Sequence, residues 1–314
     1  MPLQPIIPFE PVYADRIPEG DDWIHQVKWD GVRVLVYKNR QATSLFNRHL
    51  NERTHMYPEI NEASLYTDAS TAILDGEVIA LDHTGAPSFH EVMRRDGIRN
   101  LHHIPSVSEA VPVYYMIFDI IYCNGCWTNQ RPLHERLALL HEVVKPNRSI
   151  QIVPQHDDGN ALFSVVQQHH LEGIVSKKKD SLYEIKGKND QWRKIKNYKD
   201  LIAIVGGVSY RSGRASSLLL GLFDSSGQLQ FIGNAGPGRL TQKEWQTFLH
   251  ALDSFTSVSP PFMPFKDVPK SVHWLKPVIT VKVQYIEWPE GHSLRQPTIQ
   301  AFVSRTPESC ILPD

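Results

Sequence analysis

Residues 23–37 read WIHQVKWDGVRVLVY, in which two runs rich in β-branched and aromatic side chains flank the dipeptide Asp30-Gly31. An Asp-Gly pair between two such runs is a strong signal for a β-hairpin. We therefore predict that the strands at 23–28 and 32–37 pair with each other. Lys28 would then lie at a strand end beside a tight turn. Its amine could point into a cleft, and Asp30 could orient that amine or pair with its charge.

The chain beyond this segment mixes short strands with helices. Residues 72–81 (AILDGEVIAL) predict a second strand pair, and residues 113–122 (VYYMIFDIIY) predict a buried strand. Apolar residues at helical spacing predict helices at 133–144 and 161–170. Strand pairs mixed with helices indicate an α+β fold rather than a regular parallel βαβ sheet.

The pattern changes after about residue 200. One helix is expected at 241–252, and short strands punctuated by Gly and Ser are expected at 201–208, 217–223, 229–233 and 279–286. Several short strands with one helix favour a small β-barrel. We place the boundary near Tyr198–Leu201, which gives domains at 1–199 and 200–314. Two domains also agree with 314 residues at about 150 residues per domain.

The composition excludes several classes of protein. A hydrophobic fraction of 41% is enough to build a core, so general disorder is excluded. No apolar run approaches the roughly 18 residues that span a bilayer, and no secretion signal is expected at the start. Three cysteines are too few for a disulfide framework and predict a reducing, cytoplasmic location. Asn124-Gly125 between Cys123 and Cys126 predicts a plain hairpin turn rather than a zinc or redox site.

The net charge is informative only when it is divided by segment. The whole chain carries 33 basic and 34 acidic residues, which by itself argues against a nucleic-acid partner. Residues 172–199, however, contain nine basic and four acidic residues. Residues 201–314 contain ten basic and eight acidic residues. Residues 210–217 (YRSGRASS) add two arginines and several hydroxyls suited to a phosphate backbone. The sequence therefore predicts a basic, nucleic-acid-binding face within a neutral chain.

Candidate chemistry lies in motifs that follow Lys28 in a fixed order. They are Asp75-Gly-Glu77, Phe118-Asp119, Glu172-Gly-Ile-Val-Ser-Lys177 and Trp192-Arg-Lys194-Ile-Lys196. Lys194 and Lys196 alternate on an expected strand, so both amines would lie on one face. Glu77 and Glu172 supply hard oxygen ligands of the kind Mg²⁺ prefers. Taken singly, each motif also fits a structural role, such as a solvated basic strand, a surface glutamate or a core phenylalanine.

This order and spacing resemble the covalent nucleotidyltransferases, which comprise ATP-dependent DNA ligases, RNA ligases and mRNA-capping enzymes. The resemblance is greatest to the ligase domain of the bacterial end-joining ligase D, and it runs from Trp23 to about Arg295. It includes stretches such as residues 131–136 (RPLHER) and 217–224 (SLLLGLFD). The resemblance implies a nucleotidyltransferase domain, with ATP-grasp-like antiparallel sheets and helices, over 1–199. It implies an OB-fold β-barrel over 200–314.

The resemblance implies a reaction in three steps. Lys28 takes AMP from ATP, AMP passes to a DNA 5′-phosphate, and a 3′-hydroxyl then displaces AMP to seal the strand. Attack requires a neutral amine, which positive charge from a metal ion and from Lys194 and Lys196 would favour. In the family these two lysines hold the α-phosphate. Glu172 is expected to support the metal, and Glu77 the ribose or the metal; the metal would be Mg²⁺, with Mn²⁺ as the alternative.

The resemblance also implies which residues contact the nucleotide. Phe118 would stack on adenine, Arg33 would meet the ribose, and Arg48 would meet a phosphate. Gln26 and Val27 would border the base. Gln26 stands where the family often has glutamate, so a contact to the adenine amine would use an amide.

The last family motif departs from the usual pattern. Residues 294–297 (LRQP) match its opening, but residues 303–310 (VSRTPESC) lack the usual Asp-Lys pair. That pair helps orient the leaving pyrophosphate, so self-adenylylation would be slow unless Arg305 substitutes.

We expect the substrate to be nicked or broken duplex DNA, in DNA repair by non-homologous end joining. Ku and a repair polymerase follow as partners only from the resemblance, and we expect a monomer with no membrane association. An RNA ligase or a capping-type guanylyltransferase is the first alternative. A nucleic-acid-binding module with weakened catalysis is the second, because of the altered final motif. NAD as the cofactor is disfavoured, because no N-terminal helical module of the NAD-dependent type is present.

Overall fold

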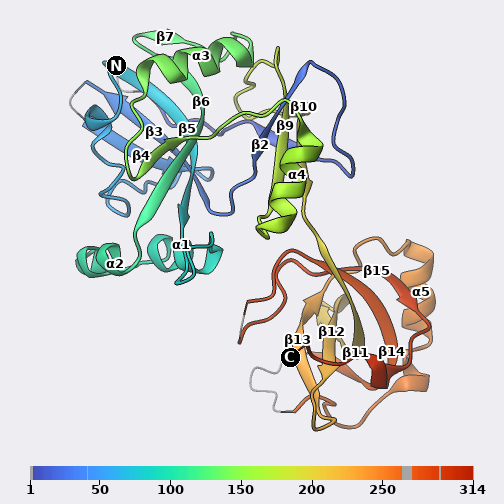
Figure 1. Cartoon of the computed structure of the whole chain (residues 1–314). Coiled ribbons are helices and arrows are strands. Elements are labelled where there is room, and N and C mark those ends of the chain that lie inside the picture. The colour runs from blue at the N-terminus through green and yellow to red at the C-terminus, as the bar shows by residue number, and fades with distance from the viewer. Residues whose placement is uncertain (1–2, 41, 264–270, 290, 314) are drawn as a thin grey trace. The chain divides into compact units, whose positions relative to one another are not determined.

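The computed structural model describes residues 3–40, 42–263, 271–289 and 291–313 (Figure 1). The chain divides into two compact units, Met1–Asn197 and Tyr198–Asp314. Each unit has its own hydrophobic core. Within the described ranges, no helix combines the length and the apolar character needed to cross a membrane.

The first unit contains ten strands and four α-helices among its described residues. The strands are β1 (Glu10–Tyr13), β2 (Trp23–Val27), β3 (Val32–Asn39), β4 (Ala42–Asn47), β5 (Thr71–Ala80), β6 (Val113–Cys123), β7 (Cys126–Trp127), β8 (Ile150–Ile152), β9 (Gly173–Lys178) and β10 (Lys188–Lys196). The helices are α1 (Phe89–Asp96), α2 (Ile104–Ala110), α3 (Leu133–Val143) and α4 (Gly159–Gln168), with 3₁₀ turns η1 (Ala63–Leu65) and η2 (Leu101–His103).

These strands form two sheets. Sheet A has the order β1-β10-β9-β2, and sheet B has the order β4-β3-β5-β6-β7 with β8 beside β6. Only the β1–β10 and β6–β8 pairs are parallel among the described strands of this unit. Mainly antiparallel sheets combined with helices confirm the predicted α+β class.

The predicted hairpin at residues 23–37 is wrong. β2 pairs with β9 in sheet A, whereas β3 pairs with β4 and β5 in sheet B. Gly31 is therefore required for close packing rather than for a turn, since a Cβ there would lie 2.1 Å from the Val78 carbonyl oxygen. As a consequence, Lys28 lies on the segment that crosses between the two sheets.

The predicted strand pair at residues 72–81 is also wrong, because one continuous strand, β5, spans Thr71–Ala80. Gly76 does not turn the chain. A Cβ at Gly76 would lie 2.5 Å from the Tyr115 ring, so glycine allows that ring to cross the strand. The straight strand carries Asp75 and Glu77 along the middle of sheet B, between β3 and β6.

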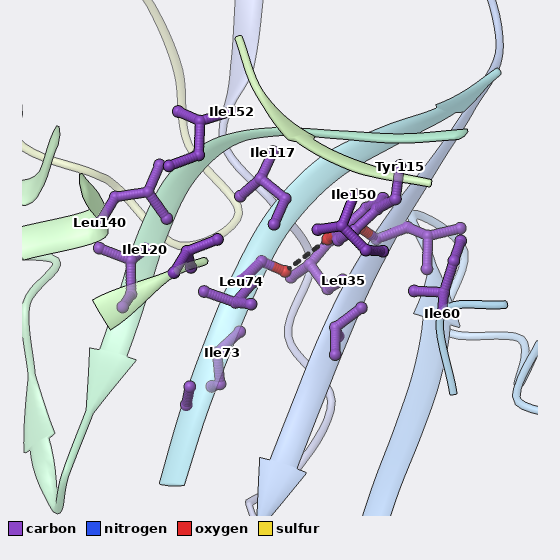
Figure 2. Close-up of a cluster of buried hydrophobic side chains, with 14 of the residues drawn as sticks. Leu35, Ile60, Ile73, Leu74, Tyr115, Ile117, Ile120, Leu140, Ile150 and Ile152 are labelled. Atoms are coloured by element: carbon purple, nitrogen blue, oxygen red, sulfur yellow. Dashed lines mark hydrogen bonds between the residues drawn. The ribbon is translucent and has the colours of Figure 1, made fainter. Parts of the chain in front are cut away.

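The core of the first unit lies around sheet B, and Figure 2 shows part of it. Leu35, Leu74, Ile117 and Leu140 are among its fully buried side chains. The Tyr115 hydroxyl lies 2.9 and 3.1 Å from the Val34 and Leu74 carbonyl oxygens and shares its one proton between them, so its burial leaves the hydroxyl paired. The core thereby holds β3, β5 and β6 in one rigid sheet.

The predicted strand at 113–122, the two predicted helices and the Asn124-Gly125 turn are confirmed. β6, α3 and α4 lie where residue spacing placed them. Asn124 and Gly125 have φ values of 47° and 89°, the left-handed pair of a two-residue hairpin turn between β6 and β7. Helix α4 packs on sheet A through a small cluster of Leu162, Val166, Ile174 and Ile195.

The second unit is a small barrel. Its elements are β11 (Lys199–Arg211), β12 (Arg214–Phe223), β13 (Leu229–Ala235), α5 (Gln242–His250), η3 (Leu252–Phe255), β14 (Val272–Tyr285), β15 (Thr298–Val303) and η4 (Pro307–Ser309). The strands are antiparallel in the order β13-β12-β11-β14-β15. A bridge between Gly236 and Thr298 joins the two edges and closes the sheet, as the sequence predicted.

Candidate active site

The candidate site lies between one face of sheet A and one face of sheet B. Alternation puts Trp192, Lys194 and Lys196 on one face of β10, and the register sets Lys194 opposite Val175 of β9. In sheet B, Arg33 lies opposite Glu77. Contacts between side chains of the two sheets define the site described below.

Glu172 connects Lys28 to Lys196. Its carboxylate is almost completely buried, and it accepts a hydrogen bond from Lys28 Nζ on one oxygen. The other oxygen lies 3.3 Å from Lys196 Nζ. Backbone bonds hold the three segments together: Lys28 N–H donates to Gly173 O at 2.9 Å, and Asn197 N–H donates to Glu172 O at 2.8 Å. Three motifs far apart in sequence therefore meet at one carboxylate.

Positive charge is concentrated around this carboxylate. The pKa of Lys194 is lowered by burial and then by the charges of Lys28 and Lys196. Burial also lowers the pKa of Lys196, although Glu172 opposes the effect. No carboxylate pairs with Lys194 among the residues that the structure describes. An ammonium in this position is suited to bind a phosphate oxygen.

Glu77 is the second carboxylate of the site. Burial raises its pKa to about 7, Glu172 and Asp75 add to the shift, and Lys28 and Arg33 oppose it. A divalent cation between Glu77 and Glu172 would relieve this excess of negative charge, and Mg²⁺ typically takes one or two carboxylates together with water and phosphate. No group of three or more His, Cys, Asp or Glu side chains suited to hold a metal occurs in the described ranges. The two carboxylates are a ligand set that fits Mg²⁺.

Arg33 is held by Asp75, a residue to which sequence reasoning assigned no role. Arg33 Nε and Nη2 donate to the two Asp75 oxygens at 2.9 and 2.6 Å. The Tyr183 hydroxyl donates to Asp75 Oδ2 at 2.7 Å. Asp75 and Tyr183 are fully buried. An acidic residue inside an apolar strand was the available signal, because a buried carboxylate requires a cationic partner.

Phe118 borders the site from β6, and cations already lie over its ring. Lys177 Nζ is 4.5 Å from the ring centroid, and Arg33 Cζ is 5.2 Å from it. Lys177 Nζ also lies 4.0 Å from the centroid of Trp192. Burial lowers the pKa of Lys177 to about 7, although Asp119 and Asp75 oppose the shift. Lys177 and Trp192 are further site residues whose roles sequence reasoning missed.

Gln26 and Val27 face opposite ways because they are neighbours on a strand. Gln26 is buried, and its Nε2 donates to Val153 O at 3.1 Å. Its Oε1 is buried and has no hydrogen-bond partner among the described residues, so it can accept one from a ligand. The Val27 side chain packs with the α4 cluster, which leaves only its main chain beside Lys28.

Two predicted site residues are not brought into the cluster by a described contact. Arg48 is exposed at the end of β4 and donates to His49 at 3.2 Å. It follows Asn47, which pairs with Val34, so Arg48 lies near the Arg33 end of sheet B. Asp30 lies on the crossing segment, but the ion pair of Lys28 is made with Glu172.

Comparison with known proteins identifies the family. The sequence model of the ATP dependent DNA ligase domain matches residues 13–196, and that of the ATP dependent DNA ligase C terminal region matches residues 211–303. The chain belongs to the ATP-dependent DNA ligase family. The resemblance predicted from the motifs is therefore confirmed, as are the nucleotidyltransferase and OB-fold architectures of this chain.

Individual relatives agree with this assignment. The chain is 29% identical to the multifunctional non-homologous end joining DNA repair protein LigD of Mycobacterium tuberculosis H37Rv, over 88% of this chain and 36% of that protein. It is 30% identical to the SPbeta prophage-derived DNA ligase-like protein LigB of Bacillus subtilis, over 68% of this chain and 76% of LigB. A solved structure of mycobacterial DNA ligase D complexed with ATP and MES matches with a TM-score of 0.53 and 25% identity over 98% of both chains.

The barrel carries the altered final motif. Arg295 donates to Glu287 at 3.4 Å, and burial lowers its pKa to about 10. Arg305, the candidate substitute for the missing lysine, is exposed after β15 and donates to Ser309 Oγ at 3.1 Å. Arg305 thus lies on the surface of its own unit.

Proposed function

We propose that this chain joins nicks or breaks in duplex DNA by ATP-dependent ligation, with Lys28 as the nucleophile. The observation that carries the proposal is the meeting of Lys28, Glu172 and Lys196 in one ion-paired cluster with Lys194 nearby. The buried Glu172 carboxylate fixes the Lys28 amine in place. The neighbouring ammonium groups of Lys194 and Lys196 can then bind a phosphate.

The first step forms a bond between Lys28 Nζ and the α-phosphorus of ATP. The bond from that phosphorus to the pyrophosphate oxygen breaks, and pyrophosphate leaves. Lys28 must first lose a proton, while Lys194 and Lys196 neutralise charge on the α-phosphate. Glu77 and Glu172 would hold Mg²⁺, or Mn²⁺ in its place, and this ion would neutralise phosphate charge.

The nucleotide would occupy the space beside Phe118 and Gln26. The vacant Oε1 of Gln26 supports a hydrogen bond from the adenine amine. The Phe118 ring would stack on the base, and Arg33 would bind the ribose. Arg48 would reach a phosphate only if ATP draws its exposed side chain inward.

The later steps use DNA. AMP moves from Lys28 to the DNA 5′-phosphate, and the 3′-hydroxyl then attacks that phosphorus and releases AMP. In this proposal, residues 1–199 carry the adenylyl transfer. The barrel at 200–314 supports the duplex, with the arginines of the β11–β12 hairpin near the phosphate backbone.

The wider role of the chain is also proposed from its relatives. It spans about a third of the LigD proteins it matches, which are described as multifunctional non-homologous end joining DNA repair proteins. We assign the chain to end joining on that basis, with Ku and a repair polymerase as its partners.

Nick sealing on labelled duplexes tests the proposal. The wild-type chain with ATP and Mg²⁺ should join a nicked DNA duplex, and Lys28→Ala should not. Sealing of a nicked RNA duplex in preference to DNA would favour the RNA-ligase alternative. Binding to DNA without any joining would favour the nucleic-acid-binding alternative.

A further inference from the structure

Tyr183 occupies an unusual position relative to the site. It lies in the loop between β9 and β10, yet its hydroxyl reaches a carboxylate of sheet B. Its ring packs edge-on against Trp192 at 5.9 Å between centroids, and Arg136 lies over it at 5.8 Å. The side chain is fully buried, so its position is fixed from both sheets.

The hydroxyl of Tyr183 is the centre of a chain of hydrogen bonds. It accepts from Phe9 N–H at 3.1 Å and from Arg33 Nη2 at 3.4 Å, and it donates to Asp75 Oδ2 at 2.7 Å. Asp75 in turn accepts both bonds of the Arg33 fork. A bidentate pair fixes the plane of the guanidinium relative to the carboxylate, and a third bond to the same carboxylate fixes the carboxylate itself.

We propose that Tyr183 is a positioning residue for nucleotide binding, whose hydroxyl orients Asp75 and contacts Arg33, and so holds the Arg33 guanidinium where the ribose binds. The inference rests on the proposed function for its ligand, ATP. Arg33 lies directly opposite Glu77 and over the Phe118 ring, so a change in its orientation alters the wall of the nucleotide site.

The surroundings of Tyr183 keep its hydroxyl protonated, so that it always donates to Asp75. Burial, with the charge of Asp75, raises the pKa of the Tyr183 hydroxyl well above its ordinary value, so the proton stays on the phenol. Without that hydroxyl, the described bonds to Asp75 Oδ2 would come from Arg33 alone, and both Phe9 N–H and Arg33 Nη2 would lose an acceptor. The guanidinium would then have more freedom before ATP binds, and binding would have to restrict it.

The test is Tyr183→Phe, which removes one oxygen and keeps every ring contact. The measurement is the rate of Lys28 adenylylation as a function of ATP concentration. We expect the half-saturating ATP concentration to rise about 5- to 10-fold, as for the loss of one buried hydrogen bond, with a maximal rate within about twofold of wild type.

Tyr57→Phe is the matched control. Tyr57 is also fully buried and also donates to an ion-paired aspartate, since its hydroxyl lies 2.9 Å from Asp96 and Arg53 donates to Asp96 at 2.7 Å. It has the same local chemistry without a described contact to Asp75 or Arg33. We expect a comparable fall in melting temperature and an unchanged ATP dependence.

Double variants separate positioning from a general loss of structure. If Tyr183 acts through Arg33, Tyr183→Phe should add nothing to the ATP dependence of Arg33→Ala. Should Tyr183→Phe yield little folded protein, Asp75→Asn is the substitute. It weakens the ion pair that holds Arg33 and should also raise the half-saturating ATP concentration.

Equal ATP dependence for Tyr183→Phe and Tyr57→Phe, or full additivity with Arg33→Ala, would overturn the inference. Failure of the proposed function is distinguishable, because the wild-type chain itself would then not adenylylate Lys28.

Discussion

Glu172 lies between Lys28 and Lys196, so its charge serves two lysines at once. In a buried setting such a carboxylate cannot be removed without leaving ammonium groups unpaired. In the proposed mechanism, the same oxygens would also hold a divalent cation, which would neutralise phosphate charge. Glu172 would then serve both the positioning of the amines and the binding of the metal.

Glu172→Gln keeps the size of the side chain and removes its charge. We expect the rate of Lys28 adenylylation to fall about 100-fold or more, with a higher Mg²⁺ requirement, because both the lysine contacts and the metal site lose their anion. Quenched-flow labelling across a Mg²⁺ titration measures both effects. Glu184→Gln is the control, since Glu184 is exposed and bonds only Asn189 in its described hydrogen bonds. Equal rates for the two variants would contradict the assignment.

Lys177 gives a pH dependence of stability. A lysine in the unfolded chain titrates near 10.5, whereas the folded pKa is about 7. Between these pH values the unfolded chain binds more protons, so the free energy of unfolding rises with pH by at most about 1.4 kcal/mol per pH unit. Lys177→Met should remove this slope. Urea unfolding at pH 7.5, 8.5 and 9.5 measures the slope. The same dependence of the free energy of unfolding on pH in wild type and variant would refute the prediction.

At the scale of elements, the central error of the sequence predictions concerns which strands lie side by side. Asp-Gly in a β-rich context normally turns the chain, and at Asn124-Gly125 the same logic succeeds because both residues adopt positive φ. At Gly31 the glycine serves the close approach of β5 instead. Local sequence reports what a residue can do, but it does not report which distant strand will contact it.

The same distinction applies to the site. Lys28, Glu172 and Lys196 could be grouped from motif order, and the structure brings them into contact. The bond from Tyr183 to Asp75 could not be predicted, since it joins residues 108 positions apart and no motif links them. Its only advance signal was an acidic residue in the middle of an apolar strand.

Gly31→Ala tests the packing explanation at the crossing between the sheets. A Cβ 2.1 Å from a backbone oxygen forces β3 away from β5, and we expect a loss of at least about 2 kcal/mol in the free energy of unfolding. Thermal or urea unfolding measures the loss. Gly236→Ala is the control, because a Cβ at Gly236 would meet no described atom within 4 Å and the φ of this residue is not positive. A Gly31→Ala protein as stable as wild type would show that the packing against Val78 does not require glycine.

At the scale of the whole molecule, a net charge near zero coexists with local groups of basic residues. Arg211 and Arg214 face each other across the β11–β12 hairpin, and both are exposed. Like charges directly opposite are unfavourable in isolation, whereas a phosphate between them removes the repulsion. The proposed binding of DNA by the barrel is thus compatible with a net charge of −1 for the whole chain.

Changing both arginines to alanine should weaken DNA binding without slowing Lys28 adenylylation. Each phosphate contact contributes about one unit to the slope of log affinity against log salt, so we expect the slope to fall by about two. Fluorescence anisotropy on a nicked duplex at several salt concentrations measures it. Lys145→Ala is the control, because Lys145 is exposed and ion-paired with Asp68. An unchanged slope in the double variant would exclude the hairpin from the DNA interface.

The identity of the adenylylated residue tests the role of Lys28 most directly. The chain is incubated with ATP and Mg²⁺, digested, and mapped by mass spectrometry, and nicked DNA is then added to the intact adduct. We predict one AMP per chain, bound to Lys28, absent from Lys28→Ala and discharged by nicked DNA. An adduct on another residue, or one that persists in Lys28→Ala, would contradict Lys28 as the nucleophile.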